Sequence, residues 1–298
     1  MPEFVLFLPQ MRLSFPDLVA RALAAEAAGF AGITGMDHLV PPMAADHPMY
    51  EAVVTSTWLA AHTERLRVGS LVLCDAFRHP AVLAREAVSV DHASGGRYEL
   101  GLGWGSVPEE LGTFGVGSVR PRDRVRRLRE TLEVLRALWA GETVDYDGEF
   151  HHLRGARQEP RPLGHIPIVV GGVGPKTLAL VAEFADWWNV HVGDVDRLEE
   201  LRPHVGAARL SIQDVVALVP DEGRREAVAA LTARRFGWAH PTVGDAAELV
   251  DHFGRLAERG VERFYVWFAD FAPPDTLAAF GAGVIAPLAA TGGWEGRL

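Results

Sequence analysis

The chain has 298 residues, of which 48% are hydrophobic and 23% are charged, and its formal net charge is −10. Its length suits one α/β barrel, and it shows neither a signal peptide nor an apolar run near the roughly 20 residues that span a bilayer, which predicts a cytoplasmic protein with no membrane association. The negative charge argues against non-specific binding to nucleic acid, which requires a cationic surface.

Short apolar runs that predict buried strands alternate with helical patterns through the first half of the chain. Residues 4–8 are continuously apolar, as in a parallel strand that is covered on both faces. Ser14 then offers a helix cap, with Pro16 and Asp17 in the first turn. The alternation continues with strands over 31–34, 66–73 and 98–102 and with helices over 50–62, 80–93 and 122–139.

The segment 142–162 interrupts this alternation. Within it, residues 144–151 predict a small hairpin with Asp147 and Gly148 at its turn. We interpret the segment as an insertion after the fourth βα unit. The pattern then resumes with strands over 166–170, 187–192, 215–219 and 264–268 and with a helix over 175–185.

Eight β-to-α alternations favour a closed (β/α)8 TIM barrel that forms one domain over residues 1–298. The alternative is an open doubly wound sheet. That fold places a glycine-rich fingerprint directly after its first strand, and residues 7–11 contain no glycine. In a barrel, catalytic groups lie on the loops that follow the carboxyl ends of the strands.

His38 is the candidate catalytic residue that this rule selects. It follows the second predicted strand beside Asp37, and an unperturbed imidazole exchanges protons near neutral pH. On composition alone, the same role is open to His47, His79, His191 and His240. We expect no metal, because the histidines lack the spacing of a zinc site and the single cysteine, Cys74, excludes a cysteine-rich one.

Two glycine clusters follow predicted strands. Gly171, Gly172 and Gly174 precede Pro175 at a helix start, where bare amides and the helix dipole favour a phosphate. A tight turn between strand and helix explains the same residues. The second cluster, Gly101, Gly103 and Gly105, alternates along the fourth strand and would let a planar ring approach the backbone, although a barrel corner is the alternative.

Residues 120–129 carry six arginines against one aspartate. In so acidic a protein, this stretch could bind the polyanionic tail of a ligand. A solvated helix face, which needs no ligand, is the interpretation that we favour.

Taken together, the motifs are more specific than each alone. They comprise Asp37-His38, then Arg-His-Pro-Ala-Val-Leu-Ala-Arg at 78–85, Asp-His-Ala-Ser-Gly-Gly-Arg at 91–97, the glycines of 101–105, Ile-Pro-Ile-Val-Val-Gly-Gly at 166–172 and Ala-Asp-Trp-Trp-Asn at 185–189. This set resembles the luciferase-like monooxygenase superfamily over residues 4–268, most weakly between 192 and 242. The resemblance implies a (β/α)8 barrel, a planar tricyclic cofactor at the carboxyl ends of the strands, and a homodimer.

Asp37-His38 with the Arg-His-Pro segment looks most like the F420-dependent branch of that superfamily. The resemblance then implies that Asp37 contacts the cofactor and that His38 donates a proton near it. The other cofactor-binding residues that it implies are Val72, Cys74, Gly103, Gly105, Glu109, Gly171, Gly172 and Gly174. Family members often carry a non-proline cis peptide at a position that corresponds here to Leu71-Val72.

This chain departs from the F420-dependent glucose-6-phosphate dehydrogenases of the family. Ser106 stands where they carry a glutamate after the strand-four glycines, although Glu109 and Glu110 follow closely. Pro41 and Pro42 lie where they carry an aromatic residue after the histidine. Their substrate-phosphate lysines have no counterpart either, so we do not expect oxidation of a sugar phosphate.

The resemblance therefore predicts an F420-dependent oxidoreductase that moves a hydride between the deazaflavin and a small organic substrate, with reduction of an imine or activated alkene as one form of the reaction. The first alternative is a reduced-FMN-dependent monooxygenase on the same fold. The second is a barrel that binds a flavin without catalysis, because the fold alone does not determine function.

Overall fold

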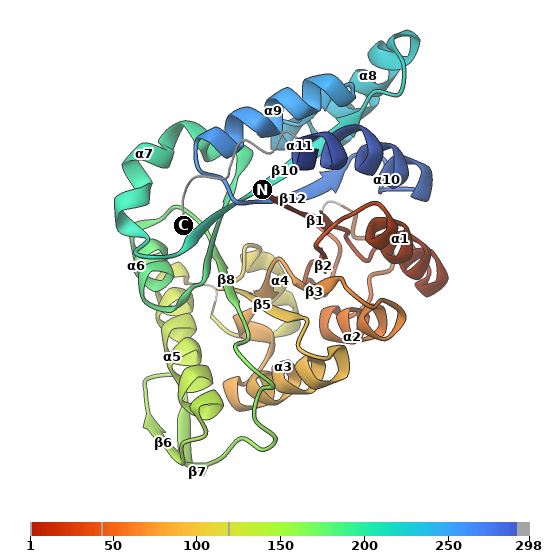
Figure 1. Ribbon diagram of the computed structural model, residues 1–298. Coiled ribbons are helices and arrows are strands. Elements are labelled where there is room, and N and C mark those ends of the chain that lie inside the picture. Colours follow the sequence, from red (N-terminus) through yellow and green to blue (C-terminus); the bar gives the residue numbers. More distant parts are fainter. Residues whose placement is uncertain (1, 43, 119, 291–298) are drawn as a thin grey trace.

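The computed structural model describes residues 2–42, 44–118 and 120–290. Eight parallel strands form its central sheet, and Figure 1 shows the helices around them. In barrel order they are β1 (Glu3–Phe7), β2 (Gly32–Gly35), β3 (Arg67–Ser70), β5 (Tyr98–Gly103), β8 (Ile168–Gly171), β9 (Trp187–His191), β10 (Arg209–Leu218) and β12 (Arg263–Phe268). Since β12 pairs with both β10 and β1, the sheet closes into a TIM barrel, as the sequence predicted.

Helices cover the outside of this barrel. They are α1 (Phe15–Ala27), α2 (Ala52–His62), α3 (Pro80–Ser94), α5 (Pro121–Ala140), α6 (Pro175–Phe184), α8 (Arg225–Phe236), α9 (Ala246–Glu258), α10 (Pro274–Phe280) and α11 (Ala286–Ala290), with the shorter α4 (Pro108–Phe114) and α7 (Leu198–Leu201). The predicted start of α1 is confirmed, because Ser14 and Asp17 form a reciprocal capping box. In the described part of the chain, no helix combines the length and the apolar character needed to cross a membrane.

The third predicted strand is divided. β3 ends at Ser70, and the short β4 (Leu73–Cys74) pairs with β5 instead. Between them the Leu71-Val72 peptide bond is cis, which confirms the prediction made from the family resemblance. Val72 lies at this break and lines the cavity described below.

The seventh strand of the barrel is longer than predicted. The sequence indicated only residues 215–219, whereas β10 runs from Arg209 to Leu218. Ser211 and Gln213 break the apolar run that marks a buried parallel strand, although both are buried here. The Ser211 hydroxyl donates to the carbonyl of Trp188, so this polar residue is satisfied inside the sheet.

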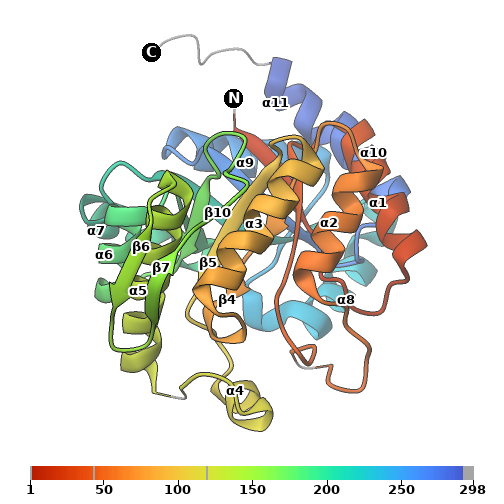
Figure 2. The same cartoon turned by 90° about the horizontal axis from the view of Figure 1, so that it is seen from below.

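The insertion forms the predicted hairpin, from β6 (Val144–Asp147) and β7 (His152–Ala156), so its second strand extends beyond residue 151. The Glu130 carboxylate of α5 accepts hydrogen bonds from the amides of Glu149, Phe150 and His151 at the turn. Figure 2 shows the hairpin lying alongside α5. Its turn brings the His151 ring to 5.6 Å from the ring of His79, in the segment after β4.

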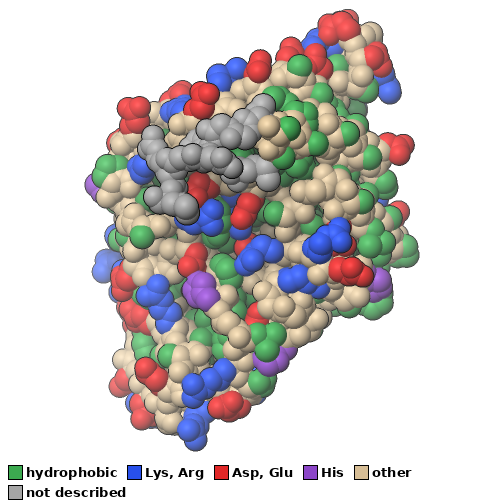
Figure 3. Space-filling view, in the orientation of Figure 1, with side chains coloured by type: hydrophobic (Ala, Val, Ile, Leu, Met, Phe, Trp, Pro, Cys, Tyr) green, Lys and Arg blue, Asp and Glu red, His purple; other side chains and the backbone are tan. Residues whose placement is uncertain are grey.

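The two ends of the barrel differ in chemistry. At the amino-terminal end, which faces the viewer in Figures 1 and 3, Figure 3 shows acidic and basic side chains intermixed. Inside that end, the buried Arg263 guanidinium donates to the Glu99 carboxylate at 2.7 and 3.0 Å and lies 3.8 Å from the Trp187 ring centre. This packing fills the amino-terminal end of the barrel. The cavity lies at the other end, where the strands have their carboxyl ends.

Candidate active site

A cavity of about 470 Å³ lies at the carboxyl ends of the strands, which is within the usual range of about 300–1,000 Å³ for ligand sites. Its walls come from β2, the β3–β4 break, β5, β8, β9 and β10 and from the loops that follow them. The cavity contains every predicted site residue but one: Asp37, His38, Val72, Cys74, Gly103, Gly105, Gly171, Gly172 and Gly174 line it.

Glu109 is the exception. It is exposed on α4, whereas its neighbour Glu110 is 8% exposed and lines the cavity. Successive residues of a helix point about 100° apart, so only one of the two adjacent glutamates can face the barrel. The glutamate of this site is therefore Glu110.

Glu110 fixes the orientation of His38. The Nδ1 atom of His38 lies 2.9 Å from Glu110 Oε2, and the amides of Leu39 and Val40 donate to Glu110 Oε1 at 2.6 and 3.0 Å. A carboxylate only accepts, so Nδ1 carries the proton and Nε2 keeps its lone pair. A histidine held in one tautomer by a carboxylate is the arrangement that proton transfer requires.

Asp37 is engaged by protein groups at both carboxylate oxygens. Arg78 donates to them at 2.6 and 3.2 Å, and the amide of Cys74 donates to Oδ2 at 2.8 Å. This buried, bidentate pair ties the end of β2 to β4. Asp37 thus holds the Cys74 segment at the edge of the cavity, and its contact with a cofactor stays a prediction.

Val72 and Cys74 form one wall beside the glycines of β5. A Cβ atom on Gly103 would lie 2.6 Å from Val72 Cγ2, so the missing side chain makes room for Val72 itself. Burial raises the pKa of the Cys74 thiol to about 12, and the carboxylates of Asp37 and Asp75 add to this effect. Cys74 is therefore a neutral, apolar wall residue at physiological pH.

The predicted phosphate site lies at the start of α6. Gly172 has φ +125°, a conformation that side chains rarely adopt, and its carbonyl accepts a hydrogen bond from the Trp188 indole at 2.9 Å. Gly174 is the N-cap, and no side chain caps the helix among the residues that the structure describes. The first amides of α6 therefore remain available to an anion, and the exposed Lys176 lies in the same turn.

Most arginines of the stretch 120–129 form contacts within the protein. Arg124 is buried, donates to the Gly105 carbonyl at 2.6 Å and stacks on Trp104, whose indole donates to Thr177 at 3.3 Å. Arg126, Arg127 and Arg129 pair with Glu149, Asp75 and Glu183, respectively. Arg120 and Arg122 are exposed, so the predicted solvated face is confined to the first turn of α5.

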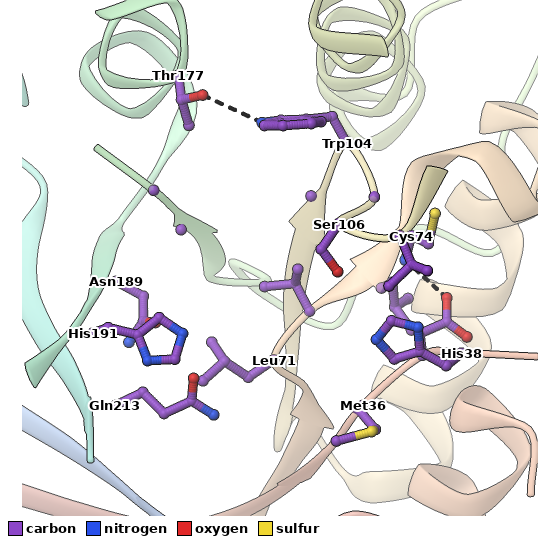
Figure 4. Close-up of a pocket in the computed structure, with 18 of the residues that line it drawn as sticks. Met36, His38, Leu71, Cys74, Trp104, Ser106, Thr177, Asn189, His191 and Gln213 are labelled. Atoms are coloured by element: carbon purple, nitrogen blue, oxygen red, sulfur yellow. Dashed lines mark hydrogen bonds between the residues drawn. The ribbon is translucent and has the colours of Figure 1, made fainter. Parts of the chain in front are cut away.

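The wall opposite His38 holds His191, one of the histidines to which the sequence left the catalytic role open, together with residues that the sequence did not single out. Figure 4 shows His191, Asn189 and Gln213 on that side, with Leu71 between them and His38. Asp194 also lines the cavity, from the loop after β9. Burial lowers the pKa of His191, and the carboxylates of Asp194 and Asp214 oppose this effect. Asp194 follows the end of β9, so the rule that selected His38 could have identified it, whereas Asn189 and Gln213 lie inside strands.

The other candidate histidines lie outside the lining. His79 caps α3 by accepting from the amide of Ala81, and His240 lies in the turn after α8. In residues 2–42, 44–118 and 120–290, no three His, Cys, Asp or Glu side chains are grouped as metal ligands.

Known proteins share this architecture. The profile of a family described as luciferase-like monooxygenase matches residues 3–214. An F420-dependent glucose-6-phosphate dehydrogenase of Mycolicibacterium fortuitum is 37% identical over 174 residues, which make up 57% of this chain and 50% of that protein. The match therefore spans half of that relative's length.

Two solved structures resemble the whole chain. An F420-dependent secondary alcohol dehydrogenase in complex with an F420-acetone adduct has a TM-score of 0.80 and 18% identity, covering 96% of this chain and 98% of that one. The monooxygenase RslO1 from Streptomyces bottropensis has a TM-score of 0.79 and 19% identity, covering 96% and 99%. At these identities the structural likeness concerns the fold, whereas the profile match covers most of the sequence. The chain belongs to the luciferase-like monooxygenase family.

Proposed function

We propose that this protein is an F420-dependent oxidoreductase that acts on a small organic molecule. The observation that carries the proposal is the His38–Glu110 pair, which faces a cavity that ends at the uncapped start of α6. One end thus supplies a proton-transferring group and the other an anion site. Relatives named as F420-dependent enzymes support this choice of cofactor.

The residues present fit such a cofactor. The first turn of α6 would hold its phosphate, Val72 and Cys74 would lie against its ring, and the exposed Lys176, Arg120 and Arg122 would face an anionic tail. When bound, the deazaflavin supplies the hydride chemistry. The chain itself orients the two molecules and moves a proton at Nε2 of His38, while the Glu110 carboxylate stabilises the imidazolium.

The first test is binding. Purified cofactor-free protein is titrated separately with F420 and FMN, and the fluorescence change is followed. Micromolar binding of F420 with much weaker binding of FMN supports the proposal. The reverse preference moves the protein to the reduced-FMN-dependent monooxygenases, and oxygen consumption becomes the next assay. Binding without turnover of any donor or acceptor supports the non-catalytic barrel.

His38→Gln tests the role of the histidine separately. The variant should bind F420 as the wild type does but lose most of its turnover, because glutamine cannot transfer the proton. Full turnover in this variant would remove His38 from the mechanism.

We also propose a homodimer, as the family resemblance implies. Its support in this chain is the exposure of apolar side chains on the neighbouring helices α2 and α3, where Val54 is 60%, Trp58 46% and Val82 51% exposed. Sedimentation of the wild type and of Trp58→Glu measures the assembly. A dimer that the substitution dissociates supports this interface.

A further inference from the structure

The charged side chains that line the cavity are predominantly acidic. Three carboxylates line it, from Asp37, Glu110 and Asp194, whereas no lysine or arginine is among the lining residues of the described chain. Asp37 is neutralised by the bidentate contact with Arg78, and Glu110 accepts three hydrogen bonds from the His38 segment. Asp194 is the carboxylate that keeps capacity for a ligand.

Asp194 lies in the 3₁₀ segment Val192–Arg197, directly after β9. Its protein partner is Arg197, whose Nη1 lies 3.4 Å from Oδ1, and the side chains are 31% and 44% exposed. An exposed pair of this length is weak and screened by salt. The Arg197 contact therefore leaves much of the Asp194 charge acting on the cavity.

The groups beside Asp194 do not neutralise its negative charge. Burial lowers the pKa of His191, which disfavours a charged imidazolium beside this carboxylate. Asn189 and Gln213, beside it in Figure 4, are uncharged amides. This wall of the cavity therefore presents a negative charge and neutral hydrogen-bonding groups.

An aromatic group of Phe7, Phe236, Trp238 and Trp267 lies toward the mouth of the barrel, outside the cavity lining. Trp267 lies 5.1 Å from Phe7, 5.0 Å from Phe236 and 6.1 Å from Trp238, measured between ring centres. It pairs in register with Val215, two residues beyond Gln213 on β10, so it stands nearer the mouth than Gln213 does. The segment after these aromatics reaches the Asp194 loop, because a Cβ atom on Gly193 would lie 3.7 Å from His240.

A carboxylate that lines a cavity without a lysine or arginine among the described lining residues favours a cationic ligand, since it attracts positive charge. We propose that the substrate of this site is a small organic cation, with a protonated amine or iminium nitrogen that Asp194 binds. The inference rests on the proposed function for treating this cavity as the active site. An anionic substrate such as a sugar phosphate would be repelled by this carboxylate.

Three probes of equal ring size test the inference: benzylamine, benzyl alcohol and benzoate, which are cationic, neutral and anionic at pH 7. Their binding is measured by calorimetry at low ionic strength, on the free protein and on the protein saturated with F420. Benzylamine should bind about three- to tenfold more tightly than benzyl alcohol, as expected for a partly exposed charge pair, and benzoate the most weakly. Added salt should reduce this difference.

Substitutions of Asp194 test whether this residue causes the preference for benzylamine. Asp194→Asn should abolish the preference for benzylamine, and Asp194→Lys should reverse it in favour of benzoate. Asp196→Asn is the matched control, because Asp196 lies two residues further on, is fully exposed and pairs with Arg259 outside the cavity. The control should bind all three probes as the wild type does.

The outcomes are distinct. Benzoate binding as tightly as benzylamine, no measurable binding of benzylamine, or an unchanged preference in Asp194→Asn would each overturn the inference. In a further outcome, F420 fails to bind although the wild type still prefers benzylamine and Asp194→Asn still loses that preference. This outcome would refute the proposed cofactor alone and leave the cation site standing.

Discussion

Glu110→Gln is the substitution that most directly tests how the site is built. Glutamine preserves the size of the side chain, and its carbonyl oxygen can still accept from the amides of Leu39 and Val40. Its NH2 group would then face Nδ1 of His38, where wild type has an accepting oxygen 2.9 Å away. The imidazole should therefore change tautomer, with the proton moving from Nδ1 to Nε2.

The magnitude follows from the bond that is lost. A hydrogen bond to a charged group contributes about 1.5–3 kcal/mol, so loss of the carboxylate should lower kcat/KM by about ten- to 150-fold. The assay is reoxidation of reduced F420 by an accepted substrate, and the tautomer is read independently from the ¹⁵N shifts of His38. F420 affinity should change little, because α6 and the Val72 wall are untouched.

Glu109→Gln is the matched control, since this exposed neighbour does not line the cavity. It should retain the wild-type rate and tautomer. Equal losses in the two variants, or an unchanged tautomer in Glu110→Gln, would refute the assigned pairing.

Three further measurements follow from burial and close packing. Because burial raises the pKa of Cys74 to about 12 from 9.0, the native thiol should react with a disulfide reagent at pH 8 about a thousandfold more slowly than in the urea-unfolded chain, and equal rates would contradict this. Burial lowers the pKa of His151 from 6.5 to about 4, so its contribution to stability is present above pH 6.5 and is lost as the pH falls toward 4. Between pH 7 and 4.5, urea unfolding should show about 2–3 kcal/mol more loss in wild type than in His151→Gln, whereas parallel curves would refute the shift. Gly103→Ala, whose Cβ would lie 2.6 Å from Val72 Cγ2, should weaken F420 binding and lower stability by about 1–3 kcal/mol, while Gly174→Ala, 4.0 Å from Thr177, should keep its stability.

Most of the barrel could be predicted because its strands are short, apolar and bounded by helix signals. The place of His38 followed from the same logic, since the strand before it set its position at the carboxyl end. The cis bond at Leu71-Val72 came from a family resemblance, and no local pattern in the sequence indicates it.

The unpredicted features depend on tertiary geometry. Glu109 and Glu110 are chemically identical neighbours, and only the phase of the seven-residue helix α4 decides which of them reaches His38. The first half of β10 was missed because Gln213 faces a cavity, where a polar residue replaces the expected apolar one. Similarly, the sequence predicted Arg124 on a solvated helix face. The residue is buried instead, because its guanidinium donates to the Gly105 carbonyl and stacks on the Trp104 ring.

The two sides of the cavity also differ in the charged and hydrogen-bonding groups that they leave available to a ligand. On the side of Asp37 and Glu110, carboxylates are bound by protein donors, and the surface offered to a ligand is backbone, glycine and Val72. On the side of Asp194, side chains with free capacity face the ligand. The first kind of wall suits a molecule that is the same throughout the family, and the second suits one that differs. Both walls lie within residues 3–214, which the family profile matches, so a difference in substrate has to come from individual side chains such as Asp194.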